Sequence, residues 1–98
     1  MVQKITFTKT AEKSFIDIAT FLEENISFIA AEKFAVQVDA KIEKLKIQPF
    51  IGRPSQKAKT IRKINVNKTV QMMYRVSGRT LTVSGFFDTR QDPSKNRF

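Results

Sequence analysis

The alternation of hydrophobic and polar positions predicts a β-strand at the start of the chain. From residue 2 to residue 8, odd and even positions differ in character, and Ile5 and Phe7 are the bulky apolar residues of the odd face. A period of two places successive side chains on opposite faces of an extended backbone. We therefore expect a first strand over residues 2–8.

The next two segments carry apolar residues at spacings of three and four, the pattern of helices that bury one side. We predict that Thr10 caps the first helix, which ends near Glu24 or Asn25. Ser27 is predicted to cap the second helix, and Pro49 to end it. The short connection predicts an antiparallel hairpin. The predicted buried stripes are Ala11, Phe15, Ile18, Ala19 and Leu22, then Ala31, Phe34, Ala35, Val38, Ile42 and Leu45.

After a Pro- and Gly-containing loop over residues 49–59, the period returns to two. Three strands are predicted, over residues 60–65, 69–76 and 80–88, with a tight turn at residues 77–79. Strict alternation places Tyr74 with Val70, Met72 and Val76, and places Phe87 with Leu81, Val83 and Gly85.

The order strand, helix, helix and three antiparallel strands predicts one α+β domain over residues 1–98. Two helices cover only one face of such a sheet, so the other face stays partly exposed. Met73 is expected to be solvated on that face, and Tyr74 to be a core residue whose hydroxyl reaches an edge. The polar positions expected on the open face are Gln71, Arg75, Thr80, Thr82 and Ser84.

The charge of the chain is concentrated in one half. The formal net charge is +9, yet residues 1–52 contain equal numbers of Lys and of acids. The only acids in residues 53–98 are Asp88 and Asp92, whereas all the remaining Lys and Arg residues of the chain lie in this segment. No carboxylate occurs from Lys44 to Phe87. This distribution favours a positive surface for nucleic acid or an acidic protein.

Several classes of function are excluded by composition. The chain has no Cys and no His, so we expect no disulfide, no thiolate or imidazole metal site and no cofactor bound through them. The longest apolar run, Phe28–Ala31, is too short to span a membrane. The N-terminus lacks the apolar core of a signal peptide, so a cytoplasmic protein without membrane contact is expected.

Six polar residues are candidates for binding a target or nucleic acid: Arg62, Lys63, Gln71, Arg75, Arg90 and Lys95. Arg62 and Arg90 are also the candidates for a catalytic role, since a guanidinium binds phosphate oxygens in a planar fork. The simpler alternative for Arg62 and Lys63 is edge-strand charge that prevents aggregation.

Taken alone, the C-terminal residues are expected to be a disordered terminus. The alternative is that a turn at Asp92-Pro93 folds the tail back across the sheet, which would place Arg90 and Lys95 beside Arg75. The loop cations are interpreted as solubility charges or partner contacts: Arg53, Lys57 and Lys59.

Four segments along the chain form a recognisable series. KITFTKTAEKSFIDIATFLEEN covers the first predicted strand and helix, and PFIGRP follows the second helix. Arg62 comes next in an I-R pair, and TVQMMYRVSGRTLTVSGFFDTRQDPSK covers the closing strands. In this order and spacing the chain resembles the RelE/ParE family of bacterial type II toxins. The resemblance implies a toxin that a small acidic antitoxin neutralises, with DNA gyrase or the ribosome and its mRNA as target.

Two activities are implied by this resemblance, and the residues favour one of them. RelE-like members cut mRNA, and their catalytic pattern is poorly matched: Ile64 and Gln71 stand where Lys and Arg are usual, and Phe98 offers no terminal hydroxyl. Losing one preorganised transition-state donor costs about 3–4 kcal/mol. The gyrase-inhibiting ParE-like branch is therefore favoured. A divergent ribosome-dependent mRNA endonuclease and a non-toxic nucleic-acid-binding relative remain the alternatives.

Overall fold

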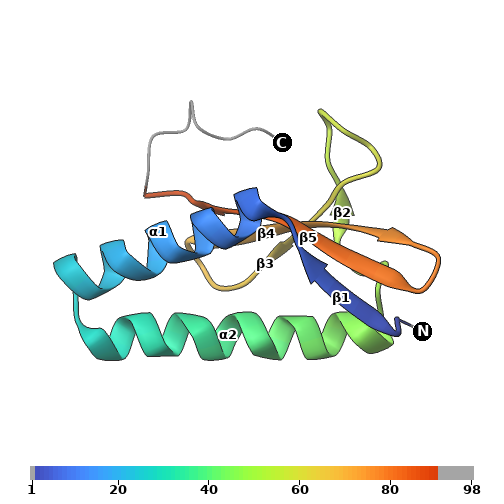
Figure 1. Cartoon of the computed structure of the whole chain (residues 1–98). Helices are drawn as coiled ribbons and strands as arrows, with labels where there is room; N and C mark the ends of the chain where they lie inside the picture. Colours follow the sequence, from blue (N-terminus) through green and yellow to red (C-terminus); the bar gives the residue numbers. More distant parts are fainter. Residues whose placement is uncertain (1, 91–98) are drawn as a thin grey trace.

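The computed structural model describes residues 2–90, and its strands form one mixed sheet in the order β1-β5-β4-β3-β2 (Figure 1). β1 runs parallel to β5, and the other neighbours are antiparallel. The elements are β1 (Lys4–Phe7), α1 (Lys9–Asn25), α2 (Phe28–Ile47), β2 (Arg53–Pro54), β3 (Arg62–Asn65), β4 (Val70–Ser77) and β5 (Thr80–Asp88).

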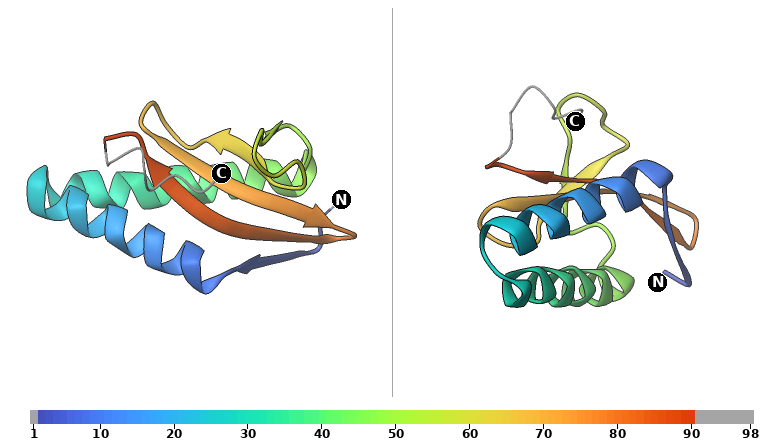
Figure 2. Two further views of the ribbon diagram at one scale, coloured as in Figure 1. Left: turned by 90° about the horizontal axis from the view of Figure 1, so that it is seen from above. Right: turned by 60° about the vertical axis from the view of Figure 1, so that its left-hand side comes forward.

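The predicted α+β architecture is confirmed, with the helical hairpin on one face of the sheet (Figure 2). The short strand β2 was not predicted, because Arg53 and Pro54 lie in a segment whose Pro and Gly content is typical of a loop. It forms an edge of the sheet by pairing with β3.

One of the two predicted helix caps is correct. Ser27 accepts a hydrogen bond from the backbone N–H of Ala30, as an N-cap does. The prediction that Thr10 caps α1 is wrong, because Thr8 accepts the bond from the Ala11 N–H at 3.0 Å. Thr8 is still extended and its own N–H pairs with Val83 of β5. The cap therefore lies two residues before the expected one, and only Thr8 separates β1 from α1.

The main core lies between the helices and the sheet. Three aromatic rings mark its centre: Phe15 of α1 stacks on Phe34 of α2 at 5.1 Å, and Phe86 of β5 meets both rings edge-on. Fully burying an aromatic or aliphatic side chain of this size contributes about 1.5–3 kcal/mol. The residues of both predicted helical stripes contribute to this core, except the half-buried Ala35, together with Val70, Met72, Tyr74, Leu81 and Val83.

A β-bulge in β5 reverses the predicted face of its last residues. Met73 pairs with Gly85, but Tyr74 pairs with Val83, so Ser84 is an extra residue on β5. An inserted residue switches every following side chain to the other face. Phe86 consequently joins the main core, and the prediction that groups Phe87 with Val83 is wrong.

The far face of the sheet carries a second, smaller apolar cluster. Phe87 and Met73 pack there against Ile61, with Ala58 at the margin. The expectation that Met73 is solvated is wrong, since only 4% of it is exposed. The segment between β2 and β3 folds back over this part of the sheet and covers it, a long-range contact that the local alternation of β4 does not encode.

Candidate functional site

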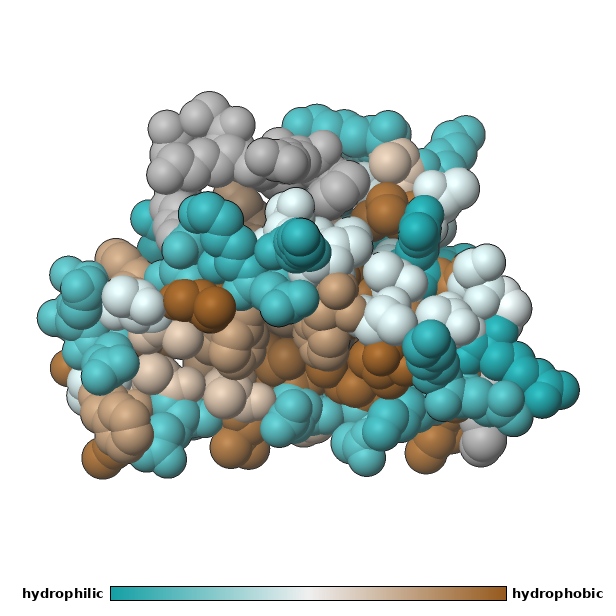
Figure 3. All heavy atoms as spheres, in the orientation of Figure 1, coloured by the Kyte–Doolittle hydropathy of each residue, from teal (hydrophilic) through white to brown (hydrophobic). Residues whose placement is uncertain are grey.

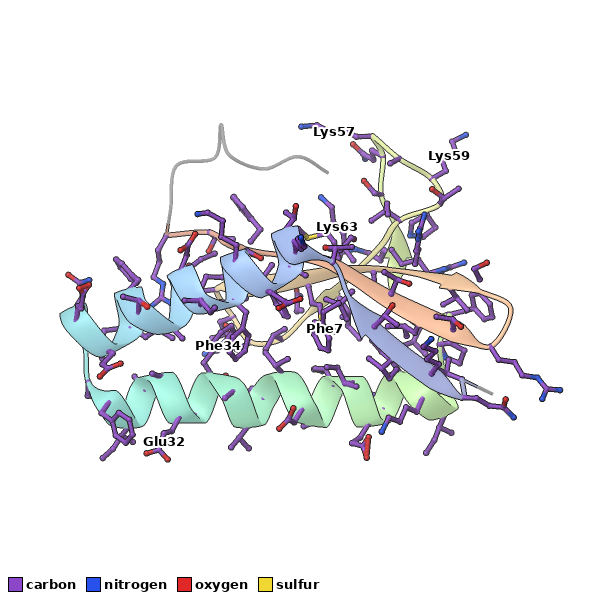
Figure 4. All side chains as sticks on the ribbon, in the orientation of Figure 1. Phe7, Glu32, Phe34, Lys57, Lys59 and Lys63 are labelled. Atoms are coloured by element: carbon purple, nitrogen blue, oxygen red, sulfur yellow. The ribbon has the colours of Figure 1, made fainter. Side chains whose placement is uncertain are left out.

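The strand register places three of the candidate residues on the face away from the helices. Lys63 lies opposite Met73, and Gln71 and Arg75 alternate with the buried positions of β4. Gln71 is held by Asn65 on the neighbouring strand, whose side-chain oxygen accepts a weak bond at 3.4 Å. Lys63 points away from α2 (Figure 4). Gln71 and Arg75 share this face, as predicted, and the strand register adds Lys63 to it.

Arg62 is turned to the other side of β3 and binds the preceding loop. Its Nη1 donates to the carbonyl oxygens of Gly52 at 2.8 Å and Phe50 at 3.1 Å. Its guanidinium also lies 5.1 Å from the centre of the Phe50 ring. Arg62 therefore fixes the path of the chain between α2 and β2, which leaves less of its hydrogen-bonding capacity for a ligand.

Tyr74 completes the same structure from β4, in agreement with the prediction of a core residue with an anchored hydroxyl. The hydroxyl donates to the Pro49 carbonyl at 2.8 Å and accepts from the Gly52 N–H at 2.9 Å. Burial raises the pKa of Tyr74 above its usual 10.0, against the smaller effects of the Gly52 N–H and of Arg62. The phenol therefore stays neutral at physiological pH and makes both of its hydrogen bonds to the loop.

Arg90 is engaged at the opposite end of the sheet. It donates from Nε and Nη2 to the two carboxylate oxygens of Asp88, at 3.0 and 2.8 Å, and lies over the Phe21 ring of α1. The Asp88 side chain is fully buried. The bonds to Asp88 raise the pKa of Arg90, so the guanidinium stays charged.

The expectation that Arg90 lies beside Arg75 is wrong. Asp88 pairs with Val70 at the start of β4, whereas Arg75 pairs with Thr82 about 16 Å further along the strand. Contact with Phe21 also places the Arg90 guanidinium on the side of the sheet that α1 covers. The predicted turn at Asp92-Pro93 and Lys95 lie outside the described residues.

A cationic groove lies between the second half of α2 and the β2–β3 edge. The groove has a volume of about 390 Å³. We call it the basic groove and define it by the four cationic residues that line it, Lys41 and Lys44 of α2, Arg53 of β2 and Lys63 of β3. Lys63 and its cross-strand partner Arg53 form the β2–β3 edge of the groove, and the Lys63 side chain lies on the face away from α2 (Figure 4). Within residues 2–90, no carboxylate forms a salt bridge with any of the four.

The pairing of β2 with β3 sets two of these cations against each other. Arg53 lies directly opposite Lys63 in the antiparallel register. Like charges at directly opposite positions destabilise a sheet by roughly 0.2–1 kcal/mol. A repulsive pair beside two further cations is a poor arrangement for stability and a good one for binding an anion.

Sequence reasoning identified only Lys63 among the four residues of the basic groove. Lys41 and Lys44 had a sufficient local explanation, since cations near a helix C-terminus oppose the helix dipole. Arg53 was interpreted as a solubility charge or a partner contact. The available signal was the absence of carboxylates after Lys44, but it did not show which cations converge.

This arrangement can bind anions. No group of three or more potential metal-ligating residues within residues 2–90 is placed to hold an ion. No helix in that part of the chain is long and apolar enough to cross a membrane.

Comparison with known proteins assigns the family. The family model described as the ParE toxin of the type II toxin-antitoxin system parDE matches residues 5–93. The chain belongs to this ParE toxin family. A search of curated proteins gave no significant match.

Solved structures share the fold of this ParE-family chain at low identity. The chromosomal ParDE system from P. aeruginosa is 17% identical, with a TM-score of 0.75 over 89% of this chain and 96% of that one. A YoeB/ParE toxin from Agrobacterium tumefaciens is 16% identical, with a TM-score of 0.61 over 88% and 98%. The E. coli DinJ-YafQ complex is 13% identical, with a TM-score of 0.60 over 90% of this chain and 96% of that one. These likenesses confirm the RelE/ParE-like fold.

Proposed function

We propose that this chain is the toxin of a type II toxin-antitoxin pair and that it inhibits DNA gyrase in the cytoplasm. Membership of the ParE toxin family supports the first part, and the resemblance to gyrase-inhibiting ParE-like toxins supports the second. An acidic antitoxin is the partner that the chemistry favours, because the chain carries a net charge of +9.

Both candidate catalytic arginines already bind partners within the chain. This observation supports a binding mechanism rather than a nuclease. Arg62 bonds loop carbonyls, and Arg90 forms a two-point ion pair with a buried carboxylate. A transition-state cation has to be free to meet the charge that develops on a phosphate. Releasing Arg90 would leave Asp88 buried without its partner, which costs several kcal/mol, on the order of 3–5.

The basic groove is the surface that we assign to an anionic partner. Its four cations come from three elements, and within residues 2–90 none of them forms a salt bridge. Carboxylates of the antitoxin would relieve the repulsion between Arg53 and Lys63, and they would compete with any anionic surface of the target. Neutralisation of the toxin would then follow from occupancy of one groove.

A supercoiling assay tests this proposal. Purified chain is titrated into gyrase with relaxed plasmid and ATP, and we expect loss of supercoiling while added RNA stays intact. The double change Arg53→Glu and Lys63→Glu should raise the concentration for half-inhibition about tenfold or more. Arg79→Glu, an exposed cation in the β4–β5 turn, is the control. Normal supercoiling at saturating chain would overturn the gyrase assignment.

A ribosome-dependent mRNA endonuclease is the second candidate, because the basic groove would also suit phosphodiester groups. It predicts codon-positioned cuts in a translated message that disappear in Arg62→Ala and Arg90→Ala. A folded variant that still cuts would remove these arginines from the mechanism. If the chain inhibits neither gyrase nor translation but binds nucleic acid with steep salt dependence, the non-toxic relative is the correct reading.

A further inference from the structure

The helix α2 carries a second apolar stripe on the side opposite the core. Ile29, Val36 and Ile47 are 75%, 67% and 69% exposed. Figure 3 shows hydrophobic patches along the lower margin of the molecule, over α2, separated by hydrophilic side chains. A row of large exposed apolar side chains along one face of a helix is typical of an interaction surface.

The spacing of this stripe is that of a coiled coil. The positions 29, 33, 36, 40, 43 and 47 alternate steps of four and three, and they hold Ile, Lys, Val, Ala, Glu and Ile. At about 100° per residue, their mean direction lies roughly 180° from that of the buried stripe of α2. Four apolar residues in a 4-3 repeat form a seam that fits a second helix.

The seam is symmetric in chemistry about Val38. Ile29 and Ile47 lie nine residues before and after it, and Val36 and Ala40 lie two residues before and after it. The two charged positions, Lys33 and Glu43, lie five residues on either side and have opposite signs. A helix that is complementary to this seam is therefore the same helix running in the opposite direction.

We infer that α2 is the surface through which two copies of this chain associate, with the two α2 helices antiparallel. Ile29 of each copy then meets Ile47 of the other copy, Val36 meets Ala40, and Lys33 meets Glu43. Because the two copies are related by a two-fold axis, each of these contacts occurs twice. Glu43 already pairs with Lys46 on its own helix, but that pair is exposed and is worth little.

Residues at the two ends of α2 fit the same arrangement. Ile26 and Phe28 are exposed at the start of the helix, and Phe50 and Ile51 are exposed beyond its end. Antiparallel pairing brings the first group of one copy near the second group of the other. Glu32, whose side chain points away from the sheet in Figure 4, would likewise lie near Lys44 of the other copy.

Charge reversal tests the antiparallel register. Sedimentation of the purified chain across the micromolar range should show a concentration-dependent dimer. Lys33→Glu places Glu against Glu43 of the other copy twice, and should weaken the dimer about tenfold or more. Adding Glu43→Lys restores opposite charges and should recover it. Lys9→Glu, an exposed cation on α1, is the matched control and should have no effect.

Cross-linking gives a second test, because the natural chain has no Cys. An oxidised equimolar mixture of Ile29→Cys and Ile47→Cys chains should give a covalent dimer. Either variant alone should not, since identical positions would lie about 27 Å apart along the antiparallel helices. A dimer from Ile29→Cys alone would indicate parallel helices. A monomer at every concentration, with no cross-link in the mixture, would overturn the inference.

Discussion

At the residue scale, Gly52 is required by close contact. A Cβ added at Gly52 would lie 2.5 Å from the Tyr74 hydroxyl and 2.9 Å from the Lys63 carbonyl oxygen. Gly52→Ala should therefore displace the loop, break the two Tyr74 bonds and lower the free energy of unfolding by about 1–3 kcal/mol. Urea denaturation measures this change. Gly85→Ala is the control, because its Cβ would meet only the Met73 methyl at 3.5 Å. Equal losses in both variants would contradict the contact argument.

Tyr74 gives the fold a dependence on alkaline pH. Its pKa is raised in the folded state, so it contributes full stability below the unfolded value of 10.0 and loses it as the pH rises further. Tyr74→Phe should lower the free energy of unfolding by about 1–3 kcal/mol at neutral pH. This deficit should shrink above pH 10, because ionisation of the Tyr74 phenol removes the stability that it contributes. Urea titrations of both proteins at several pH values measure this difference. A difference that stays constant above pH 10 would contradict the role of Tyr74.

At the scale of elements, the junction of β1 and α1 depends on Thr8. Its hydroxyl caps α1 and donates to the Ser84 carbonyl at the bulge of β5. Thr8→Ala should lower the free energy of unfolding by about 1–2 kcal/mol. Thr10→Ala should change it little, because Thr10 is exposed within the first turn. Thermal or urea unfolding separates the two, and a larger loss in Thr10→Ala would restore Thr10 as the cap.

At the scale of the whole molecule, we expect that charge in the basic groove limits stability. Arg53→Glu replaces a repulsive cross-strand pair with an attractive one, so it should raise the free energy of unfolding by about 0.5–1 kcal/mol at low salt. The gain should fall as salt screens the groove. Arg79→Glu also lowers the net charge but lies outside the groove, and it should give a smaller gain. The free energy of unfolding of both variants is measured at two ionic strengths. Equal gains in the two variants would indicate an effect of net charge and would contradict a local effect of the Arg53–Lys63 pair.

Much of the fold could be predicted because its information is local. The helical stripes, the Ser27 cap and the end of α1 follow from residues that contact their own neighbours in the sequence. The alternation of β4 likewise predicted the buried side of Tyr74. The bulge at Ser84 was not predictable in this way, because an extra residue on one strand is defined only against its partner.

The sequence by itself determined the order of elements, the two buried helical stripes and the uneven distribution of charge. Tertiary structure alone decided which cations line the same groove: α2 brings Lys41 and Lys44 to β2 and β3, while Arg62 and Arg90 bind partners within the chain. The physical reason is the distance along the sequence over which each interaction acts. Periodicity and capping act over three or four residues, whereas charge convergence depends on which distant strands and helices are packed together.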